Sequence, residues 1–225
     1  MSSFPRAQLE LREAIITTCR QLATLGLNQG TSGNVSVRVS ESSADGFLLT
    51  PTSLDYAVMQ PADVVHVTLD GVCSGPRRPS SELPFHLAIM RSRPDARAIV
   101  HTHCTHATAV SCLRRGIPAL HYLVALFGGA DIRCAEYATF GTDELSQNIL
   151  RALANRRAAL MANHGLIVIG DNLAHALSLT VEAEQLAKLY LATLATGTPP
   201  TLLDDAEIAR VAERFRTYGY RPVED

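Results

Sequence analysis

The chain is nearly free of lysine. Of the 20 lysine and arginine residues among its 225 residues, only Lys188 is a lysine. An enzyme that binds its carbonyl substrate covalently through a lysine amine would depend here on this single residue. Lys188 follows Glu184 by four residues in a predicted helix, which is the spacing of a surface ion pair. The sequence therefore disfavours Schiff-base chemistry.

The chain also lacks a strong charge of either sign and any paired pattern of cysteines. Its formal net charge is -2, so we expect no basic surface for nucleic acid. Its five cysteines are scattered without CxxC spacing, which is typical of a reducing compartment rather than of a disulfide framework. The N-terminus has no apolar signal core, and no apolar run is long enough to span a bilayer. We therefore expect a cytoplasmic protein that binds neither nucleic acid nor a membrane.

Internal repeats, low-complexity tracts and linkers are absent as well. A hydrophobic fraction of 47% over 225 residues is enough to form a core, and we expect one domain over residues 1–225. No GxGxxG motif follows a predicted strand, so a dinucleotide cofactor is not indicated. The spacing of apolar residues predicts helices at 6–26, 79–94, 105–116, 172–196 and 204–219, and strands at 35–39, 47–50, 64–71, 96–103 and, as a pair, within 158–170. This irregular mixture predicts an α/β fold in which helices flank a sheet, rather than a Rossmann fold.

The stretch "IVHTHCTH" contains three histidines. On a strand, His101 and His103 point to the same face while Cys104 points to the other, toward a core. Two imidazoles on one face can bind one metal, and catalytic zinc takes about three protein ligands. His164, in the tight turn "NHG", could be the third ligand, whereas His106 is expected at the start of the next helix, as a cap or surface residue. Taken alone, the HxH pattern also fits a half-exposed strand with two structural histidines.

Three polar turns stand out elsewhere in the chain. "QGTSGNVSVR" contains Asn34 after two glycines, "LLTPTSLDY" is rich in hydroxyl groups, and "PSSELPFH" places Ser80 and Ser81 before a helix that they can cap. Together these turns could bind a phosphate through amides and hydroxyls without a lysine. Each turn alone also fits a structural role, and Glu82 alone fits a helix first turn. The remaining histidines favour structural roles: His66, His86, His121 and His175.

The motifs taken together resemble one family. "GTSGNVSVR", "LLTPTS", "PSSE", "VHTH", "HY", "YATFGT" and "NHGLI" occur in the order and at the spacings of the class II aldolase/adducin family, over nearly the whole chain. The resemblance implies a single domain with a central, mostly antiparallel β-sheet flanked by helices. It also implies a homotetramer of C4 symmetry with active sites at subunit interfaces.

The resemblance assigns roles to individual residues. It implies that zinc, Zn(2+), is bound by His101, His103 and His164, and that Glu82 ligates the metal at rest and acts as acid/base once substrate displaces it. For the phosphate it implies Asn34, Thr52, Ser80 and Ser81, with Ser53, Thr31 and Asn28 close by. For the aldehyde it implies Tyr122 from a neighbouring subunit, together with Phe140 and Tyr218. One position departs from the family pattern. Thr52-Ser53 stands where Thr-Gly is expected, and the side chain of Ser53 either adds a hydroxyl contact or crowds the pocket.

The reaction implied is the reversible cleavage of a ketose 1-phosphate, such as L-fuculose 1-phosphate, to dihydroxyacetone phosphate and an aldehyde such as lactaldehyde. Cleavage leaves negative charge on the ketone fragment, which zinc can stabilise as a Lewis acid. Other family reactions stay open, namely cleavage of a 5-deoxy- or methylthio-pentulose phosphate, 4-epimerisation, dehydration and decarboxylation. Epimerases usually carry aspartate at the position of Glu82, and non-catalytic adducin heads lack the zinc histidines, so both are less favoured.

Overall fold

A nine-stranded sheet forms the centre of the computed structural model, which describes residues 4–39 and 45–217. The strand order is β4-β3-β2-β1-β5-β9-β8-β7-β6, and every neighbouring pair is antiparallel except β7 and β8. The predicted mostly antiparallel sheet is therefore confirmed. The strands are β1 (Asn34–Val39), β2 (Gly46–Leu49), β3 (Val65–Thr68), β4 (Cys73–Ser74), β5 (Ala98–Thr102), β6 (Ile117–Pro118), β7 (Asp131–Ala135), β8 (Ala158–Met161) and β9 (Gly165–Gly170).

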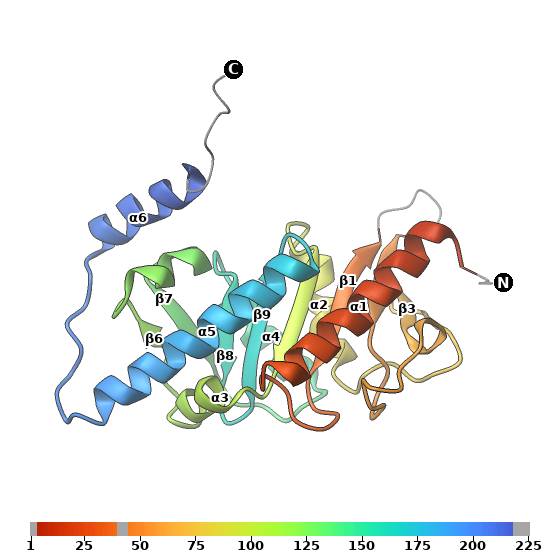
Figure 1. The fold of residues 1–225 in the computed structure, drawn as a ribbon, viewed down its shortest axis with the longest axis horizontal. Helices are drawn as coiled ribbons and strands as arrows, with labels where there is room; N and C mark the ends of the chain where they lie inside the picture. The colour runs from red at the N-terminus through yellow and green to blue at the C-terminus, as the bar shows by residue number, and fades with distance from the viewer. Residues whose placement is uncertain (1–3, 40–44, 218–225) are drawn as a thin grey trace, which may run out of the picture.

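Helices cover both faces of this sheet. They are α1 (Arg6–Thr24), α2 (Leu83–Ser92), α3 (Thr105–Cys112), α4 (Asp143–Ala152), α5 (Leu173–Leu194) and α6 (Asp205–Thr217), with the short 3₁₀ helices η1 (Pro61–Asp63) and η2 (Tyr122–Phe127). One core cluster joins the sheet to α1, α3 and α5, and a second joins its other face to α2 and α4. Figure 1 shows α1 and α5 lying across one face, with α6 at the end formed by β6 and β7, where it packs on η2. Within the described ranges, no helix is both long and apolar enough to cross a membrane.

Side chains of β5 alternate between the two core clusters. Val100 packs with α1, α3 and α5, whereas Ile99 packs with α2 and α4. His101 therefore points to the face of Ile99, and Cys104 joins the same cluster as Val100. The predicted division of "IVHTHCTH" by strand parity is correct, although His103 lies just beyond the last residue of β5.

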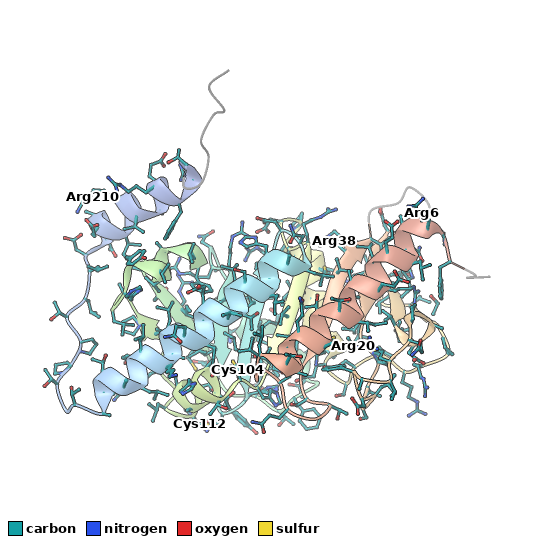
Figure 2. All side chains as sticks on the ribbon, viewed as in Figure 1. Arg6, Arg20, Arg38, Cys104, Cys112 and Arg210 are labelled. Carbon is teal, nitrogen blue, oxygen red and sulfur yellow. The ribbon has the colours of Figure 1, made fainter. Side chains whose placement is uncertain are left out.

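The five cysteines all lie in described residues and are all free. Cys19 and Cys104 are buried, and burial raises the pKa of both thiols. Cys104 lies inside the molecule near α5, whereas Cys112 is exposed at the end of α3 (Figure 2). The expected absence of a disulfide framework is therefore confirmed.

Two predicted helix ends differ from the structure. The N-cap of α2 is Glu82, and neither serine caps the helix with its side chain. The hydroxyl of Ser80 instead accepts a hydrogen bond from the backbone N–H of Glu82 at 3.2 Å, which fixes the turn before the helix. Helix α3 ends at Cys112 rather than at Gly116, because Arg114 adopts a left-handed conformation with φ of 53°.

The predicted surface pair between Glu184 and Lys188 is wrong. The carboxylate of Glu184 accepts hydrogen bonds from the backbone N–H groups of His106 at 2.9 Å and Ala107 at 2.8 Å, and it lies 2.7 Å from Nδ1 of His106. These N–H groups belong to the first turn of α3, which has no partners for them within the helix. A carboxylate there also interacts favourably with the helix dipole. Glu184 of α5 thus caps α3 from outside, while Lys188 is exposed.

This contact predicts a specific loss of stability. Glu184→Ala should lower the free energy of unfolding by about 1–3 kcal/mol, because it leaves two partly buried N–H groups without acceptors. Urea unfolding followed by circular dichroism measures the change. Glu182→Ala on the same helix is the matched control and should change stability by less than about 0.5 kcal/mol. Equal effects of the two substitutions would contradict the capping role.

Candidate active site

Three histidines meet at the end of β5. His101 is the fourth residue of that strand, His103 follows it, and His164 lies in the turn between β8 and β9. Because β5 pairs with β9, the turn before β9 lies beside the end of β5. One nitrogen from each ring lies within 4.8 Å of the other two, and Nε2 of His101 is 3.0 Å from Nε2 of His103. The structure thus brings together the three predicted metal ligands.

The turn that carries His164 requires glycine at the next position. A Cβ atom on Gly165 would collide with the carbonyl oxygen of Thr102 and lie 3.0 Å from Cδ2 of His103. The turn is further held by Asn163, which adopts a φ of 53° and whose side-chain oxygen accepts a hydrogen bond from Arg114 at 2.9 Å. Asn163 and Gly165 together therefore fix the position of the third histidine.

Hydrogen bonding of His101 and burial of His103 favour the ring forms that bind a metal. Nδ1 of His101 lies 2.9 Å from the carbonyl oxygen of Leu166 and donates to it, so in the neutral ring the Nε2 lone pair faces the cluster. Burial, together with the charges of His101 and His164, lowers the pKa of His103 to about 4. His103 is therefore neutral at physiological pH, which is the form that binds metals.

Glu82 completes the cluster. One carboxylate oxygen, Oε2, lies 3.0 Å from Nε2 of His101, and the other, Oε1, lies 3.0 Å from Nε2 of His164. Burial raises the pKa of Glu82, but the charge and hydrogen bond of His101 and the neighbouring His164 outweigh it and hold this pKa well below its usual range. The side chain is only 9% exposed and is a carboxylate.

The donor set fits a divalent metal. With zinc–nitrogen bonds of about 2.0–2.1 Å, two ligand atoms of a tetrahedral zinc site are about 3.3 Å apart. Three separations are close to this value, since His101–His103, His101–Glu82 and His164–Glu82 are each 3.0 Å apart, and the three histidine nitrogens lie within 4.8 Å of one another. Oε1 of Glu82 is buried without a protein hydrogen-bond partner of suitable angle, as expected for a ligand atom that faces a metal. These four residues are the ones that would bind it.

A cavity of about 360 Å³ opens beside the cluster. Its walls combine Glu82, His103 and His164 with the three polar turns, while His101 lies buried behind them. Of the residues predicted to contact substrate, the structure places the following in this lining: Thr31, Asn34, Thr52, Ser53, Ser80, Ser81 and Phe140. No lysine or arginine is among the described residues that line it.

Backbone contacts hold the three turns together. The N–H of Ser80 donates to the carbonyl oxygen of Thr50 at 3.0 Å, and the N–H of Thr52 donates to that of Arg78 at 3.1 Å. The hydroxyl of Tyr56 donates to the carbonyl oxygen of Gly33 at 2.7 Å and so supports the turn before Asn34. The supporting role of Tyr56 was not predicted, because a single tyrosine after a turn indicates no particular partner.

Ser53 adopts a backbone conformation that is typical of glycine. Its φ of 56° is left-handed, which glycine adopts freely and which costs other residues about 1–2 kcal/mol. Its hydroxyl lies 3.4 Å from the hydroxyl of Thr52 on the exposed side of the turn. The side chain of Ser53 therefore adds a hydroxyl group to the cavity wall.

Two of the predicted substrate residues that the structure describes, Tyr122 and Asn28, are not in the lining of this cavity. Tyr122 lies on η2, 48% exposed, with its ring centre 6.2 Å from that of Phe215 in α6. Asn28 is buried next to Gly33, and both atoms of its side-chain amide lack a hydrogen-bond partner. Tyr218 lies outside the described residues. The role of Tyr122 toward a neighbouring subunit stays a prediction.

Sequence reasoning missed a polar contact beneath the cavity. His86, predicted to be structural, is fully buried, and its Nε2 lies 2.6 Å from Oδ1 of Asn34. Nδ2 of Asn34 donates to Glu82 at 2.8 Å. Burial, followed by the charge of His101, lowers the pKa of His86 to about 3 although Glu82 opposes the shift. The sequence indicated this contact only through the spacing of four residues from Glu82 to His86, which places both on one side of a helix.

Comparison with known proteins identifies the family. Residues 13–191 match the sequence model described as the class II aldolase and adducin N-terminal domain. An L-fuculose phosphate aldolase of Escherichia coli strain K12 is 51% identical over 212 residues, covering 94% of this chain and 97% of that protein. A 5-methylthioribulose-1-phosphate/5-deoxyribulose-1-phosphate aldolase of Rhodospirillum rubrum is 48% identical over 215 residues, covering 96% and 95%. A solved L-fuculose 1-phosphate aldolase superposes with a TM-score of 0.88 at 37% identity, covering 96% of this chain and 98% of that one.

The chain therefore belongs to the class II aldolase and adducin family. It is an enzyme of the class II aldolase type, a lyase, as are these relatives. The family and the fold predicted from the motifs are confirmed. Class II aldolases depend on a metal, and the histidine cluster could hold one.

The close contact at Gly165 predicts how the cluster can be disturbed. Gly165→Ala should weaken metal binding by about 10–100-fold, because the turn must shift and carry His164 away from His101 and His103. Competition with a chromophoric chelator measures the affinity. Gly197→Ala is the control, since a Cβ atom there would meet no atom within 4 Å, although Gly197, unlike Gly165, has a positive φ of 75°. Undiminished metal affinity in folded Gly165→Ala protein would contradict the proposed constraint.

Proposed function

We propose that this enzyme is a zinc-dependent aldolase that reversibly cleaves a ketose 1-phosphate, of the L-fuculose 1-phosphate type, to dihydroxyacetone phosphate and an aldehyde such as lactaldehyde. One observation carries the proposal. Three imidazoles and a buried carboxylate open onto a cavity whose other walls are three turns rich in hydroxyl and amide groups. The activities named for the relatives from Escherichia coli and Rhodospirillum rubrum support it.

Cleavage of the carbon–carbon bond leaves negative charge on the ketone fragment. Zinc, when bound by His101, His103 and His164, supplies a Lewis acid that stabilises this charge. Neutral imidazole ligands suit this task because they do not cancel the charge of the metal. Lys188, the one lysine of the chain, is exposed on α5 and does not line the cavity, so a Schiff base has no candidate residue there.

The phosphate end of the substrate is assigned to the three turns. Thr52, Ser80 and Ser81 contribute hydroxyl groups and Asn34 an amide to one wall of the cavity. The start of α2 lies directly after the two serines, and its free N–H groups and dipole favour an anion. The phosphate does not react, so its binding free energy serves to hold the ketone at the metal.

Glu82 is assigned the proton transfers. Its carboxylate lies between the histidine cluster and the cavity, and Oε1 has no protein hydrogen-bond partner. In the cleavage direction it accepts the proton of the substrate hydroxyl as the carbon–carbon bond breaks and then delivers a proton to the carbon of the ketone fragment, which gives dihydroxyacetone phosphate. In the reverse direction both proton transfers run backwards. General acid–base catalysis of this kind contributes typically about 10²–10⁴-fold.

The aldehyde end is assigned to the aromatic rim and to a second subunit. Phe140 and Tyr137 are exposed and line the outer part of the cavity. Tyr122 is half-exposed away from this cavity, which suits a residue that acts on a neighbouring subunit's site. We therefore propose a cytoplasmic C4 homotetramer in which Tyr122 reaches the aldehyde across an interface. Tyr218, which lies outside the described residues, is assigned to the aldehyde side with Phe140.

A second candidate differs only in the aldehyde. Cleavage of 5-deoxy- or 5-methylthio-pentulose 1-phosphates uses the same cluster and the same phosphate wall, and the relative from Rhodospirillum rubrum carries that name. Epimerase, dehydratase and decarboxylase reactions are less favoured, because Glu82 stands where epimerases usually carry aspartate. A non-catalytic binding domain is disfavoured by the complete histidine set.

Removal of one imidazole tests the metal and the reaction together. His101→Ala should lose stoichiometric zinc, measured by elemental analysis, and also the release of dihydroxyacetone phosphate, measured by coupled reduction. His175→Ala, which removes a half-buried histidine at the start of α5, should change neither. Retained zinc and full activity in His101→Ala would refute the assignment.

A substrate panel separates the two aldolase candidates. With zinc bound, we expect kcat/KM to be highest for L-fuculose 1-phosphate when compared with 5-deoxyribulose 1-phosphate and 5-methylthioribulose 1-phosphate. A preference for either pentulose phosphate would move the assignment to the second candidate. If the zinc-loaded enzyme cleaves none of the three, the aldolase proposal fails.

A further inference from the structure

A buried chain of four polar side chains lies beneath the cavity. The hydroxyl of Ser36 lies 2.8 Å from Nδ1 of His86, Nε2 of His86 lies 2.6 Å from Oδ1 of Asn34, and Nδ2 of Asn34 lies 2.8 Å from Oε2 of Glu82. All four residues are buried. His86 does not line the cavity, so it reaches the reaction only through Asn34.

The chemistry of these groups allows one direction of hydrogen bonding. An ionised carboxylate can only accept, so the amide of Asn34 must present its NH₂ group to Glu82 and its oxygen to His86. The oxygen can only accept, so Nε2 of His86 must donate. The neutral ring then accepts from the hydroxyl of Ser36 at Nδ1, and a protonated ring would donate to that hydroxyl. Nε2 donates to Asn34 in both cases.

The orientation of the Asn34 amide affects the contacts of two anions, the carboxylate of Glu82 and the phosphate of the substrate. Its nitrogen carries two hydrogens, of which Glu82 takes one, and Asn34 lines the wall assigned to the phosphate. In the opposite orientation, the carbonyl oxygen would face the carboxylate and the phosphate together. A buried acceptor placed against a buried anion is unfavourable, since no donor satisfies either group.

We propose that His86 is a positioning residue that locks the Asn34 amide with its NH₂ group toward Glu82 and the phosphate end of the cavity. Its donation from Nε2 makes the productive amide orientation the stable one, and the hydroxyl of Ser36 satisfies Nδ1 of the ring. The proposal rests on the proposed function for its link to turnover. The hydrogen-bonding chain itself is a property of the folded protein.

The fold places these groups in contact through short-range periodicity. Glu82 and His86 are four residues apart at the start of α2, so they lie on one side of it. Asn34 and Ser36 are two residues apart on β1 and point to the same face of the sheet. Pairing of β1 with β5 sets Asn34 opposite His101, beside the metal cluster. One register therefore defines the chain of hydrogen bonds and the cluster together.

Two substitutions of His86 separate positioning from packing. His86→Leu fills the buried space but cannot donate, whereas His86→Gln has an amide N–H that can reach the oxygen of Asn34. We expect His86→Leu to lower kcat/KM for the ketose 1-phosphate by about 10–100-fold, with lower kcat and higher KM, at unchanged zinc content. His86→Gln should recover at least about half of the decrease in the logarithm of kcat/KM.

Inorganic phosphate gives a readout that does not need turnover. Its dissociation constant, measured by calorimetry on the zinc-loaded enzyme, should rise about 5–20-fold in His86→Leu and less in His86→Gln, since a hydrogen bond to a charged group contributes about 1.5 kcal/mol or somewhat more. A role in packing alone would lower the melting temperature of both variants while leaving phosphate affinity and kcat of the folded protein unchanged. That result would overturn the proposal.

The ring form of His86 can be observed directly. In ¹⁵N-histidine-labelled wild-type enzyme, we expect the His86 resonances to report a proton on Nε2, and Ser36→Ala to weaken phosphate binding in the same direction as His86→Leu. A neutral ring protonated only at Nδ1 would overturn the proposal. Because neither measurement requires cleavage, a failure of the aldolase assignment is distinguishable from a failure of the positioning role.

Discussion

The pairing of β5 with β1 on one side and β9 on the other is the constraint on which the site depends. It sets Asn34 opposite His101 and brings the turn with His164 to the end of β5. A slip of one residue would turn His101 to the opposite face of the sheet. Such a slip is prevented because Ile99 and Val100 are fully buried in different core clusters. The hydrophobic core therefore defines the geometry of the metal ligands.

Charge balance imposes the second requirement. Three imidazoles lie close to the carboxylate of Glu82, a residue that is only 7% exposed. A buried carboxylate is unfavourable unless positive charge lies close by, and here either protonated imidazoles or a metal ion can supply it. Neutral imidazoles can bind a metal ion through their lone pairs, and the metal ion then supplies the positive charge beside the carboxylate. The low pKa of His103, a consequence of burial and neighbouring charges, favours this second arrangement.

Periodicity allowed the local part of this structure to be predicted from the sequence. Alternation along β5 separated His101 from Cys104, and turn chemistry suggested His164 as a partner far along the chain. Contacts between distant elements could not be predicted, because spacing indicates which face a side chain occupies but not what lies opposite. Glu184 has the spacing of a surface ion pair, yet it caps α3. His86 was expected to be structural, but its contact with Asn34 could not be predicted because it depends on how α2 packs on β1.

The scarcity of lysine has a consequence for the way the cavity treats anions. Its described lining offers hydroxyl groups, amides and the start of α2, without lysine or arginine. A cationic side chain beside Glu82 would pair with the carboxylate and compete with the histidines for it. Neutral donors avoid this competition, because Asn34 can donate to Glu82 and still leave its charge to the metal cluster. The orientation of a neutral amide is not fixed by charge, however, so it needs a second hydrogen-bond partner. In this fold that partner is His86.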